Sequence, residues 1–231
     1  MREVSGKMIY DSLKELVDPK HTAIIVVDMQ NDYCSPGGIF HQNGMDINRV
    51  GEVIVPQIKL IEEARRLKVM IIFIQNTTEP GCVDDSPAWL YFKTRERKVR
   101  SNDKKRPTVP AEHTVEGTWG HQIISELGRR PQDPIVKKHR SSAFVNTDLD
   151  QILRSNGIDS LIVIGAVTQG CVASTARDAQ HYDYYVIVVS DCVASFQQPL
   201  HEAALKVLAS RCDVVMSQDI IREWANIGPR V

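Results

Sequence analysis

Three residues of types used in covalent hydrolysis stand next to apolar segments of the chain: Asp28, Lys138 and Cys171. Cys171 comes directly before residues 172–182, whose pattern predicts a helix. Free N–H groups at a helix N-terminus stabilise a thiolate and can bind an oxyanion. Cys171 is therefore a candidate nucleophile. A buried, unreactive cysteine is the alternative, and position alone slightly favours it.

Asp28 ends the apolar run at residues 22–28 (TAIIVVD), which predicts a buried strand. A carboxylate at the end of such a strand is partly desolvated, which moves its pKa towards the range of a general base. Capping of backbone N–H groups in the next loop is an equally good alternative for Asp28. For Asp32, four residues later, we expect the capping role.

Lys138 lies in a basic stretch at residues 137–140. Such stretches are usually solvated. In a strand, however, Lys138 and Arg140 share one face while Lys137 and His139 share the other, so one pair can point inward. An inward lysine beside an aspartate keeps its charge and favours a neighbouring thiolate.

Alternating strands and helices predict the fold. Expected strands lie at 22–28, 69–75, 134–137, 160–164, 185–190 and 214–215; expected helices lie at 50–68, 118–127, 147–156, 172–182, 198–210 and near the C-terminus. Long loops are expected at 31–44 and 77–110; the second is expected to be a binding loop or to carry short helices of its own. We predict an α/β fold of three α-β-α layers, with a mostly parallel sheet flanked by helices on both faces. Ligands of such folds bind at the carboxyl ends of the strands.

Composition excludes several classes of protein. The 231 residues suit a single domain, 1–231, with residues 1–20 as an N-terminal extension. A net charge of −1 gives no reason to expect nucleic acid or membrane as a partner. No apolar stretch approaches the roughly 18 residues of a membrane span, and no signal peptide opens the chain, so we expect a cytoplasmic protein. The basic run Lys93 to Arg106 is expected to be solvated surface.

Cysteine and histidine spacing gives no sign of a metal site or a disulfide framework. The five cysteines are odd in number and form no CxxC pair. No second cysteine lies close to Cys171, which ranks a redox role low. The histidines form no i, i+4 pair; they are His21, His41, His113, His121, His139, His181 and His201. We expect neither a metal nor a cofactor.

Three segments together resemble the isochorismatase-like cysteine hydrolases. They are residues 22–33 (TAIIVVDMQNDY), Lys138 with the SAF and TDL that follow at 142–144 and 147–149, and residues 165–179 (GAVTQGCVASTARDA). They occur in the family's order and span residues 22 to about 195. The resemblance implies an Asp28–Lys138–Cys171 triad. It also implies a cis peptide at Ala166–Val167 and an oxyanion hole formed by the N–H groups of Val167 and Cys171.

The resemblance further implies acyl transfer through a thioester, with Asp28 as the proton carrier. The vinyl-ether hydrolysis of true isochorismatases goes with members that lack the cysteine. Nicotinamidases of the family carry a metal in an Asp-x-His arrangement, which residues 75–82 (QNTTEPGC) do not contain. Nicotinamide is therefore not the expected substrate.

The layout is most similar to the ureidoacrylate amidohydrolase and N-carbamoylsarcosine amidase branch. Shared features are Ser86-Pro87, Gly117-Thr118-Trp119, and a lysine segment with Arg140 and Asn146-Thr147. Gln169-Gly170 differs from the Asn-x pair of ureidoacrylate enzymes, which leaves the exact substrate open. Arg140 suits a substrate carboxylate, with plain surface charge as the alternative. The expected substrate contacts are Gln30, Asn76, Trp119, Arg140 and Gln169.

We therefore expect a metal-independent cysteine amidohydrolase. It would cleave a carbon–nitrogen bond, other than a peptide bond, of a small ureido, carbamoyl or amide compound and release ammonia. The family resemblance implies a homo-oligomer, either a dimer or a tetramer. The alternatives are a hydrolase of biuret-like or maleamate-like amides, a true isochorismatase, and a catalytically silent member that acts as a binding protein.

Overall fold

The computed structural model describes residues 1–94, 110–225 and 227, and its centre is a six-stranded sheet. The strand order is β5-β4-β3-β6-β7-β8, and all neighbouring strands are parallel. The strands are β3 (Thr22–Val27), β4 (Met70–Asn76), β5 (Ile135–Lys138), β6 (Ser160–Ala166), β7 (Tyr185–Ala194) and β8 (Asp213–Val215).

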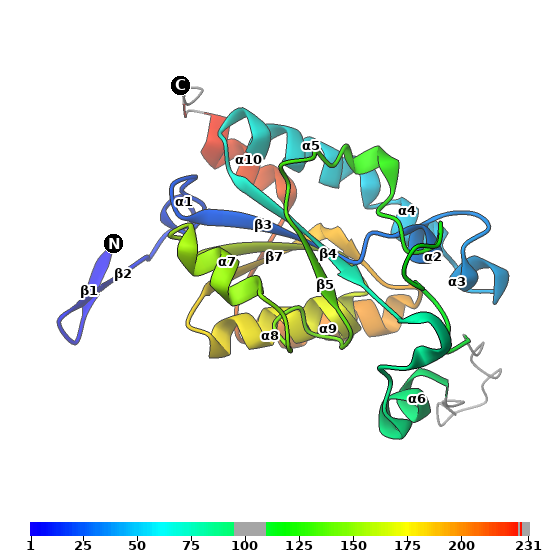
Figure 1. Ribbon diagram of the computed structural model, residues 1–231. Helices are drawn as coiled ribbons and strands as arrows, with labels where there is room; N and C mark the ends of the chain where they lie inside the picture. The colour runs from blue at the N-terminus through cyan, green and yellow to red at the C-terminus, as the bar shows by residue number, and fades with distance from the viewer. Residues whose placement is uncertain (95–109, 226, 228–231) are drawn as a thin grey trace.

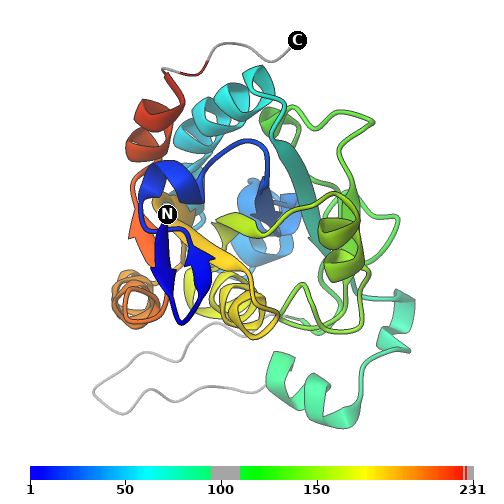
Figure 2. The ribbon, with the colours of Figure 1, turned by 90° about the vertical axis from the view of Figure 1, so that its left-hand side faces the viewer.

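Helices cover both faces of this sheet (Figures 1 and 2). One face carries α5 (Ile54–Arg66) and α10 (Ser217–Ala225), with α1 (Leu13–Leu16) and α4 (Asn48–Gly51) nearby. The other face carries α7 (Leu149–Ser155), α8 (Ala173–His181) and α9 (Gln198–Leu208). The predicted three-layer α/β fold is confirmed.

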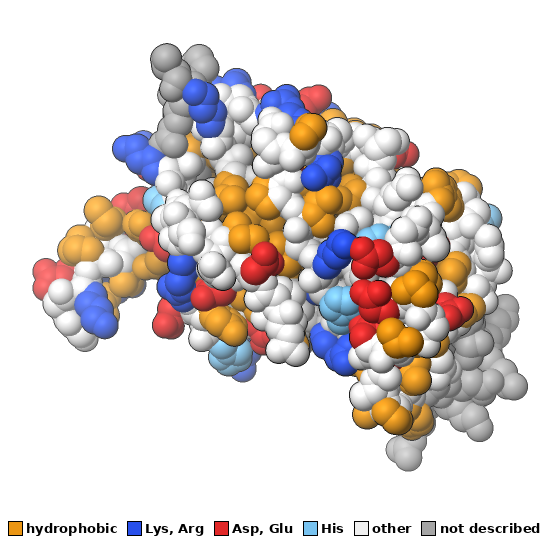
Figure 3. All heavy atoms as spheres, viewed as in Figure 1, with side chains coloured by type: hydrophobic (Ala, Val, Ile, Leu, Met, Phe, Trp, Pro, Cys, Tyr) orange, Lys and Arg blue, Asp and Glu red, His pale blue; other side chains and the backbone are white. Residues whose placement is uncertain are grey.

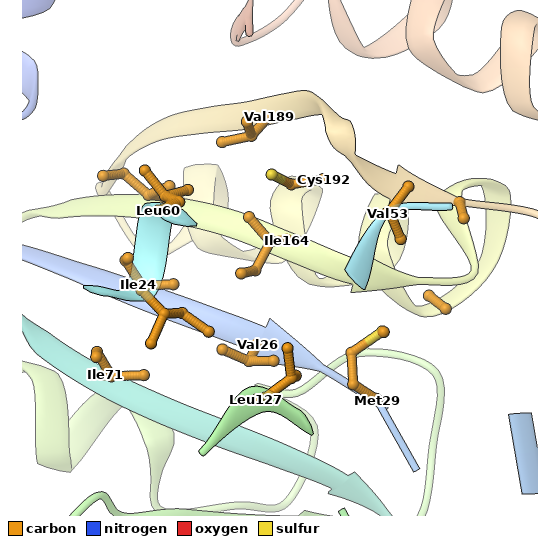
Figure 4. Close-up of a cluster of buried hydrophobic side chains, with 14 of the residues drawn as sticks. Ile24, Val26, Met29, Val53, Leu60, Ile71, Leu127, Ile164, Val189 and Cys192 are labelled. Atoms are coloured by element: carbon orange, nitrogen blue, oxygen red, sulfur yellow. The ribbon is translucent and has the colours of Figure 1, made fainter. Parts of the chain in front are cut away.

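Strand β3 is buried on both faces and divides the core in two. Ile24 and Val26 pack on one side with Leu60 of α5, as Figure 4 shows. Ala23, Ile25 and Val27 pack on the other side, with the helices of the opposite layer. Every residue of β3 is fully buried, which explains its unbroken run of apolar β-branched residues. The strand therefore presents the residue after it, Asp28, from a fixed position.

Gly165 lets β6 approach β3 closely at the end of both strands. It pairs with Val27 and has a φ of 119°, a conformation that glycine adopts freely. A Cβ atom at this position would lie 2.1 Å from the Val27 carbonyl oxygen. The close approach brings the segment after β6, which carries Cys171, next to Asp28.

The helix predicted at 118–127 is wrong. This segment is irregular, and only Ser125–Leu127 forms a single 3-10 turn, η2. Its backbone instead bonds to the loop after β3: the N–H groups of Asn31 and Asp32 donate to the carbonyls of Gln122 and Gly120. The backbone of this segment is thus satisfied by contacts with a distant loop and not by the i→i+4 bonds of a helix.

The predicted long loops contain short helices. After β3 come α2 (Asn31–Cys34) and α3 (Ile39–Gln42); after β4 come η1 (Pro80–Cys82) and α6 (Pro87–Thr94). These segments lie beyond the carboxyl ends of the strands (Figure 1). Of the basic run Lys93 to Arg106, residues 95–106 lie outside the described residues. Lys93 itself is not solvated, because it is buried against Asp85.

The N-terminal extension begins with a two-stranded hairpin, β1 (Arg2–Val4) and β2 (Lys7–Ile9), that stands apart from the sheet (Figure 1). Among the described helices, none has the length and apolar character needed to cross a membrane.

Replacing Gly165 by Ala should lower the free energy of unfolding by about 3 kcal/mol or more, because the new methyl group overlaps the Val27 carbonyl and the φ becomes strained. Thermal or urea unfolding measures the loss. Gly51→Ala in α4, where a Cβ meets nothing within 4 Å, is the control and should be neutral or slightly stabilising. Equal stability of both variants would contradict the close approach.

Candidate active site

The three residues predicted from sequence meet at the carboxyl edge of the sheet. Lys138 Nζ lies 2.8 Å from Asp28 Oδ2 and 3.3 Å from Cys171 Sγ. It also donates to the Arg140 carbonyl at 3.1 Å and lies 3.4 Å from Asn76 Oδ1. The ammonium group is therefore surrounded by acceptors, and it joins the carboxylate to the thiol.

Alternation along β5 turns Lys138 inward. Ile135 and Lys137 are exposed, whereas Val136 and Lys138 are buried, as expected for successive residues of a strand. Lys138 is among the largest fully buried side chains of the protein. Lys138 therefore points to the inner face, on the same side as Val136, whereas Lys137 points to solvent.

Asp28 leaves the direction of its strand through a left-handed backbone conformation, with a φ of 52°. Aspartate tolerates this region better than most residues. Its N–H still donates to the Ile74 carbonyl of β4, and its own carbonyl accepts from Gln30 N–H. The turn places the carboxylate, fully buried, against Lys138 and Cys171.

Burial and mutual charge set the pKa values of the pair. Burial raises the pKa of Asp28 above 3.8, although the charge of Lys138 and a hydrogen bond with Cys171 oppose the rise. For Lys138, burial is the largest effect and would lower the pKa, but the charges of Asp28 and Cys171 and the hydrogen bonds to them together outweigh burial and raise the pKa above 10.5. The lysine therefore stays charged, and the carboxylate is a stronger base than an exposed aspartate.

The Cys171 thiol is protonated at rest. Burial and the negative charge of Asp28 raise its pKa to about 12, against the lowering effect of Lys138. Lys138 favours the thiolate, as expected from the sequence, but burial and the Asp28 charge together outweigh the lysine. A base must remove the thiol proton during attack, and the Asp28 carboxylate is in place for this, because both groups contact the same Lys138 ammonium.

Cys171 lies in a wide turn, η3 (Thr168–Val172), that precedes α8. The Val167 carbonyl accepts from the N–H groups of Gly170 at 2.9 Å and Val172 at 3.4 Å. Gly170 has φ −104° and ψ −107°, outside the helical region. The Ala166–Val167 peptide bond is cis, as the resemblance implied.

Asn76 orients the lysine. Its side-chain amide donates to Tyr33 Oη at 3.0 Å and to Thr114 Oγ1 at 2.9 Å, which turns Oδ1 towards Lys138. Sequence analysis named Asn76 as a substrate contact and missed Tyr33 and Thr114. No pattern in the sequence links residues so far apart.

The side chain of Gln30 also binds the protein's own backbone. Its Nε2 donates to the carbonyls of Asn76 at 3.0 Å and His121 at 2.8 Å, and its Oε1 accepts from Asn76 N–H at 2.9 Å. The side chain is fully buried and its polar atoms are used by backbone groups, so it positions Asn76 instead of facing a ligand. Asp32 has the predicted capping role, because its carboxylate accepts from the N–H groups of Ile39 and Thr114.

The other three expected contacts lie in different settings. Trp119 is 51% exposed, and its carbonyl accepts from Asn31. The guanidinium of Arg140 lies over the Trp89 ring, 5.1 Å from its centre, and donates to the Asp84 carbonyl at 3.3 Å. Gln169 is half-buried, and its Oε1 is a buried acceptor without a hydrogen-bond partner among the described residues.

Charged side chains surround the point where the 80–94 segment meets the sheet (Figure 3). Asp85 pairs with Lys93 at 2.8 Å and, more weakly, with Arg140 at 3.7 Å. His139 pairs with Asp84 at 2.7 Å. The contacts of Asp84 and Asp85 thus hold the 80–94 segment against His139 and Arg140, which directly follow Lys138.

Histidines near the site are bound to protein groups. His121 Nε2 lies 2.9 Å from Thr77 Oγ1, and His113 Nδ1 lies 2.9 Å from the Pro110 carbonyl. Burial lowers the pKa of His113 to about 4, so this ring is neutral at pH 7. Within the described part of the chain, no three His, Cys, Asp or Glu side chains are grouped so as to hold a metal ion.

Comparison with known proteins shows which family of hydrolases has this fold and this three-residue site. The family model named Isochorismatase domain matches residues 22–220. The chain therefore belongs to the isochorismatase family and is a hydrolase.

Named relatives lie within this family. A ureidoacrylate amidohydrolase of Pseudomonas savastanoi pv. phaseolicola is 38% identical over 177 residues, covering 75% of this chain and 70% of the relative. A second, from Agrobacterium fabrum, is 36% identical over 177 residues, covering 75% of each chain.

Solved structures agree. A cysteine hydrolase of Pseudomonas syringae pv. phaseolicola has a TM-score of 0.74 at 26% identity, covering 90% of this chain and 94% of the other. The N-carbamoylsarcosine amidase of Thermoplasma acidophilum has a TM-score of 0.64 at 27% identity, covering 85% and 96%.

Removing the proton carrier should slow the reaction. Asp28→Asn is expected to lower kcat, for a substrate that the wild type hydrolyses, by about a hundredfold, the usual contribution of a positioned acid or base. Steady-state assays measure the rate. Glu62→Gln, at an exposed position of α5, is the control. An unchanged rate in a folded Asp28→Asn protein would contradict Asp28 as the base.

Alkylation of Cys171 should fall on the acid side as Asp28 becomes protonated. Burial raises the Asp28 pKa, so this limb should lie above pH 3.8. Lys138→Met removes the charge that lowers the Asp28 pKa, and the limb should then move to higher pH. The matched control is Lys137→Met, the exposed neighbour on the opposite face. A downward shift in Lys138→Met would overturn the assignment.

Proposed function

We propose that the protein is a metal-independent cysteine amidohydrolase that cleaves a carbon–nitrogen bond of a small ureido, carbamoyl or amide compound. The observation that carries this proposal is the buried Lys138 ammonium, which lies within 3.3 Å of both the Asp28 carboxylate and the Cys171 thiol. Relatives named ureidoacrylate amidohydrolase and N-carbamoylsarcosine amidase support the reaction class.

In the first half of the reaction, Asp28 takes the thiol proton as Cys171 Sγ bonds to the substrate carbonyl carbon. The carbonyl π electrons move to oxygen, and we assign the N–H groups of Val167 and Cys171 to this oxyanion. When the carbonyl re-forms, the C–N bond breaks and the nitrogen takes the proton held by Asp28. An amine or ammonia leaves, and the acyl group remains as a thioester on Cys171.

In the second half, Asp28 takes a proton from water as the water oxygen attacks the thioester. Collapse of the new tetrahedral adduct breaks the C–S bond, and the sulfur recovers the proton from Asp28. The enzyme returns to its starting protonation state. A carbamate product decomposes further to carbon dioxide and the nitrogen it retains: the amine where ammonia left first, or ammonia where the amine left first.

Lys138 has an electrostatic role throughout. Its raised pKa keeps it protonated, so it does not carry the moving proton. As negative charge passes between Asp28 and Cys171, the ammonium remains beside both groups and stabilises the charge at either place.

Two side chains carry the proposed substrate preference. The unpartnered Gln169 Oε1 is a suitable acceptor for an N–H of a ureido group, since a buried acceptor without a partner costs about 1–3 kcal/mol until a ligand satisfies it. The backbone carbonyl of Arg140 accepts from Lys138, and its guanidinium, which lies over Trp89, suits a carboxylate. Together these residues favour a small ureido acid.

The alternatives fit less well. Biuret carries no carboxylate for Arg140, and a maleamate-like amide offers Gln169 only its primary amide. Cys171 has no role in vinyl-ether hydrolysis, which counts against a true isochorismatase. A silent binding protein leaves the assembled triad without a use. A cytoplasmic location and a homo-oligomeric state remain predictions, the first in keeping with five free cysteines.

The test is ammonia release from ureidoacrylate, N-carbamoylsarcosine, biuret, maleamate and nicotinamide, with a chelator present throughout. We expect chelator-resistant turnover of a ureido acid that Cys171→Ser abolishes, because the alcohol is a far weaker nucleophile than the thiol. Exposed Ser210→Ala is the control and should keep wild-type activity.

Turnover of biuret alone would move the assignment to that alternative. Silence of the folded protein on the whole panel, with Cys171 no more reactive than the other cysteines, would overturn the proposed function and favour a binding protein.

A further inference from the structure

A single side-chain hydrogen bond ties the turn that carries Cys171 to helix α9. Thr168 Oγ1 lies 2.8 Å from His201 Nδ1. Thr168 is fully buried, follows Val167 directly and begins the turn Thr168–Val172. The bond therefore acts on the backbone between the two N–H groups assigned to the oxyanion.

His201 is suited to accept this bond. Burial lowers its pKa below 6.5; Glu202 on the same helix opposes the shift, and Arg49 of α4 adds to it. The ring is therefore neutral at pH 7, and a neutral imidazole can accept the Thr168 hydroxyl hydrogen at Nδ1 while Nε2 carries the proton. A threonine held in this way has a fixed χ1, because its β-carbon is branched.

Two side-chain hydrogen bonds connect the N-terminal half of α9 to neighbouring elements: the bond of His201, and a bond from Arg49 of α4 to Gln198 Oε1 at 2.7 Å. Residues 198–203 are exposed apart from His201, which is half-buried. The buried side chains of the helix, Ala204 and Leu208, lie in its second half. Of the two bonds, the one at His201 joins this half of α9 to the nucleophile turn.

We propose that His201 is a positioning residue of the reaction: through Thr168 it holds the Val167–Cys171 backbone in the geometry that attack requires. This inference rests on the proposed cysteine hydrolase function. His201 touches neither substrate nor thiol; its effect passes through the Thr168 hydroxyl.

The experiment compares His201→Leu, His201→Asn, Thr168→Val and Thr168→Ser, using the ureido acid that the wild type hydrolyses. His201→Leu and Thr168→Val should each lower kcat about tenfold to a hundredfold, the cost of small misplacements of reacting groups, with little change in KM. His201→Asn and Thr168→Ser keep an acceptor and a hydroxyl, and should recover most of kcat. Exposed Lys206→Leu is the control on the same helix.

The double variant Thr168→Val/His201→Leu separates positioning from simple packing. If one bond carries the effect, the double variant should lose no more kcat than the worse single variant. Thermal unfolding shows whether each variant is folded. Unchanged kcat in His201→Leu, an Asn variant no better than Leu, or losses that multiply in the double variant would each overturn the proposal.

The two proposals fail in different ways. A wild type that is silent on the whole substrate panel overturns the proposed function. The alkylation rate of Cys171 then decides the role of His201: slower alkylation in His201→Leu that His201→Asn restores supports positioning, and equal rates in all variants overturn it.

Discussion

The arrangement depends on one buried ion pair, Lys138 with Asp28. Both side chains are fully buried, and desolvating two charges costs several kcal/mol each unless their attraction and further hydrogen bonds compensate. The surroundings supply that compensation through the Arg140 carbonyl and Asn76 Oδ1 on the lysine and the Cys171 thiol on both charges. The buried ion pair therefore requires the polar groups that surround it.

The sheet supplies this pair and its neighbours from four successive strands. In the order β5-β4-β3-β6, the carboxyl ends provide in turn Lys138, Asn76, Asp28 and the Cys171 turn. Lys138 ends β5 and Asp28 follows β3, and β4 lies between these two strands. Asn76, the last residue of β4, contacts Lys138 from this middle position. Parallel strands bring their carboxyl ends to one edge, which is why four segments spread over more than 140 residues of sequence converge there.

Sequence predicted what depends on local pattern. Apolar runs located the strands, the alternation in β5 allowed an inward Lys138, and the family resemblance joined Asp28, Lys138 and Cys171. The failures come from tertiary partners. Residues 118–127 give their carbonyls to a distant loop, and Gln30 is used by backbone groups of two other segments. The thiol pKa depends on how completely the folded chain excludes water, which position beside a helix does not reveal.

Burial of the catalytic charges has a consequence for how such a protein can change over time. Replacing a buried ion pair by apolar side chains of similar volume is often neutral or stabilising, by about 1–4 kcal/mol. Removing one partner alone, however, leaves an uncompensated buried charge and costs about 3–5 kcal/mol. Any route to an inactive descendant without the pair therefore passes through a destabilised intermediate, so the requirement to fold protects the catalytic charges even where selection for activity is relaxed.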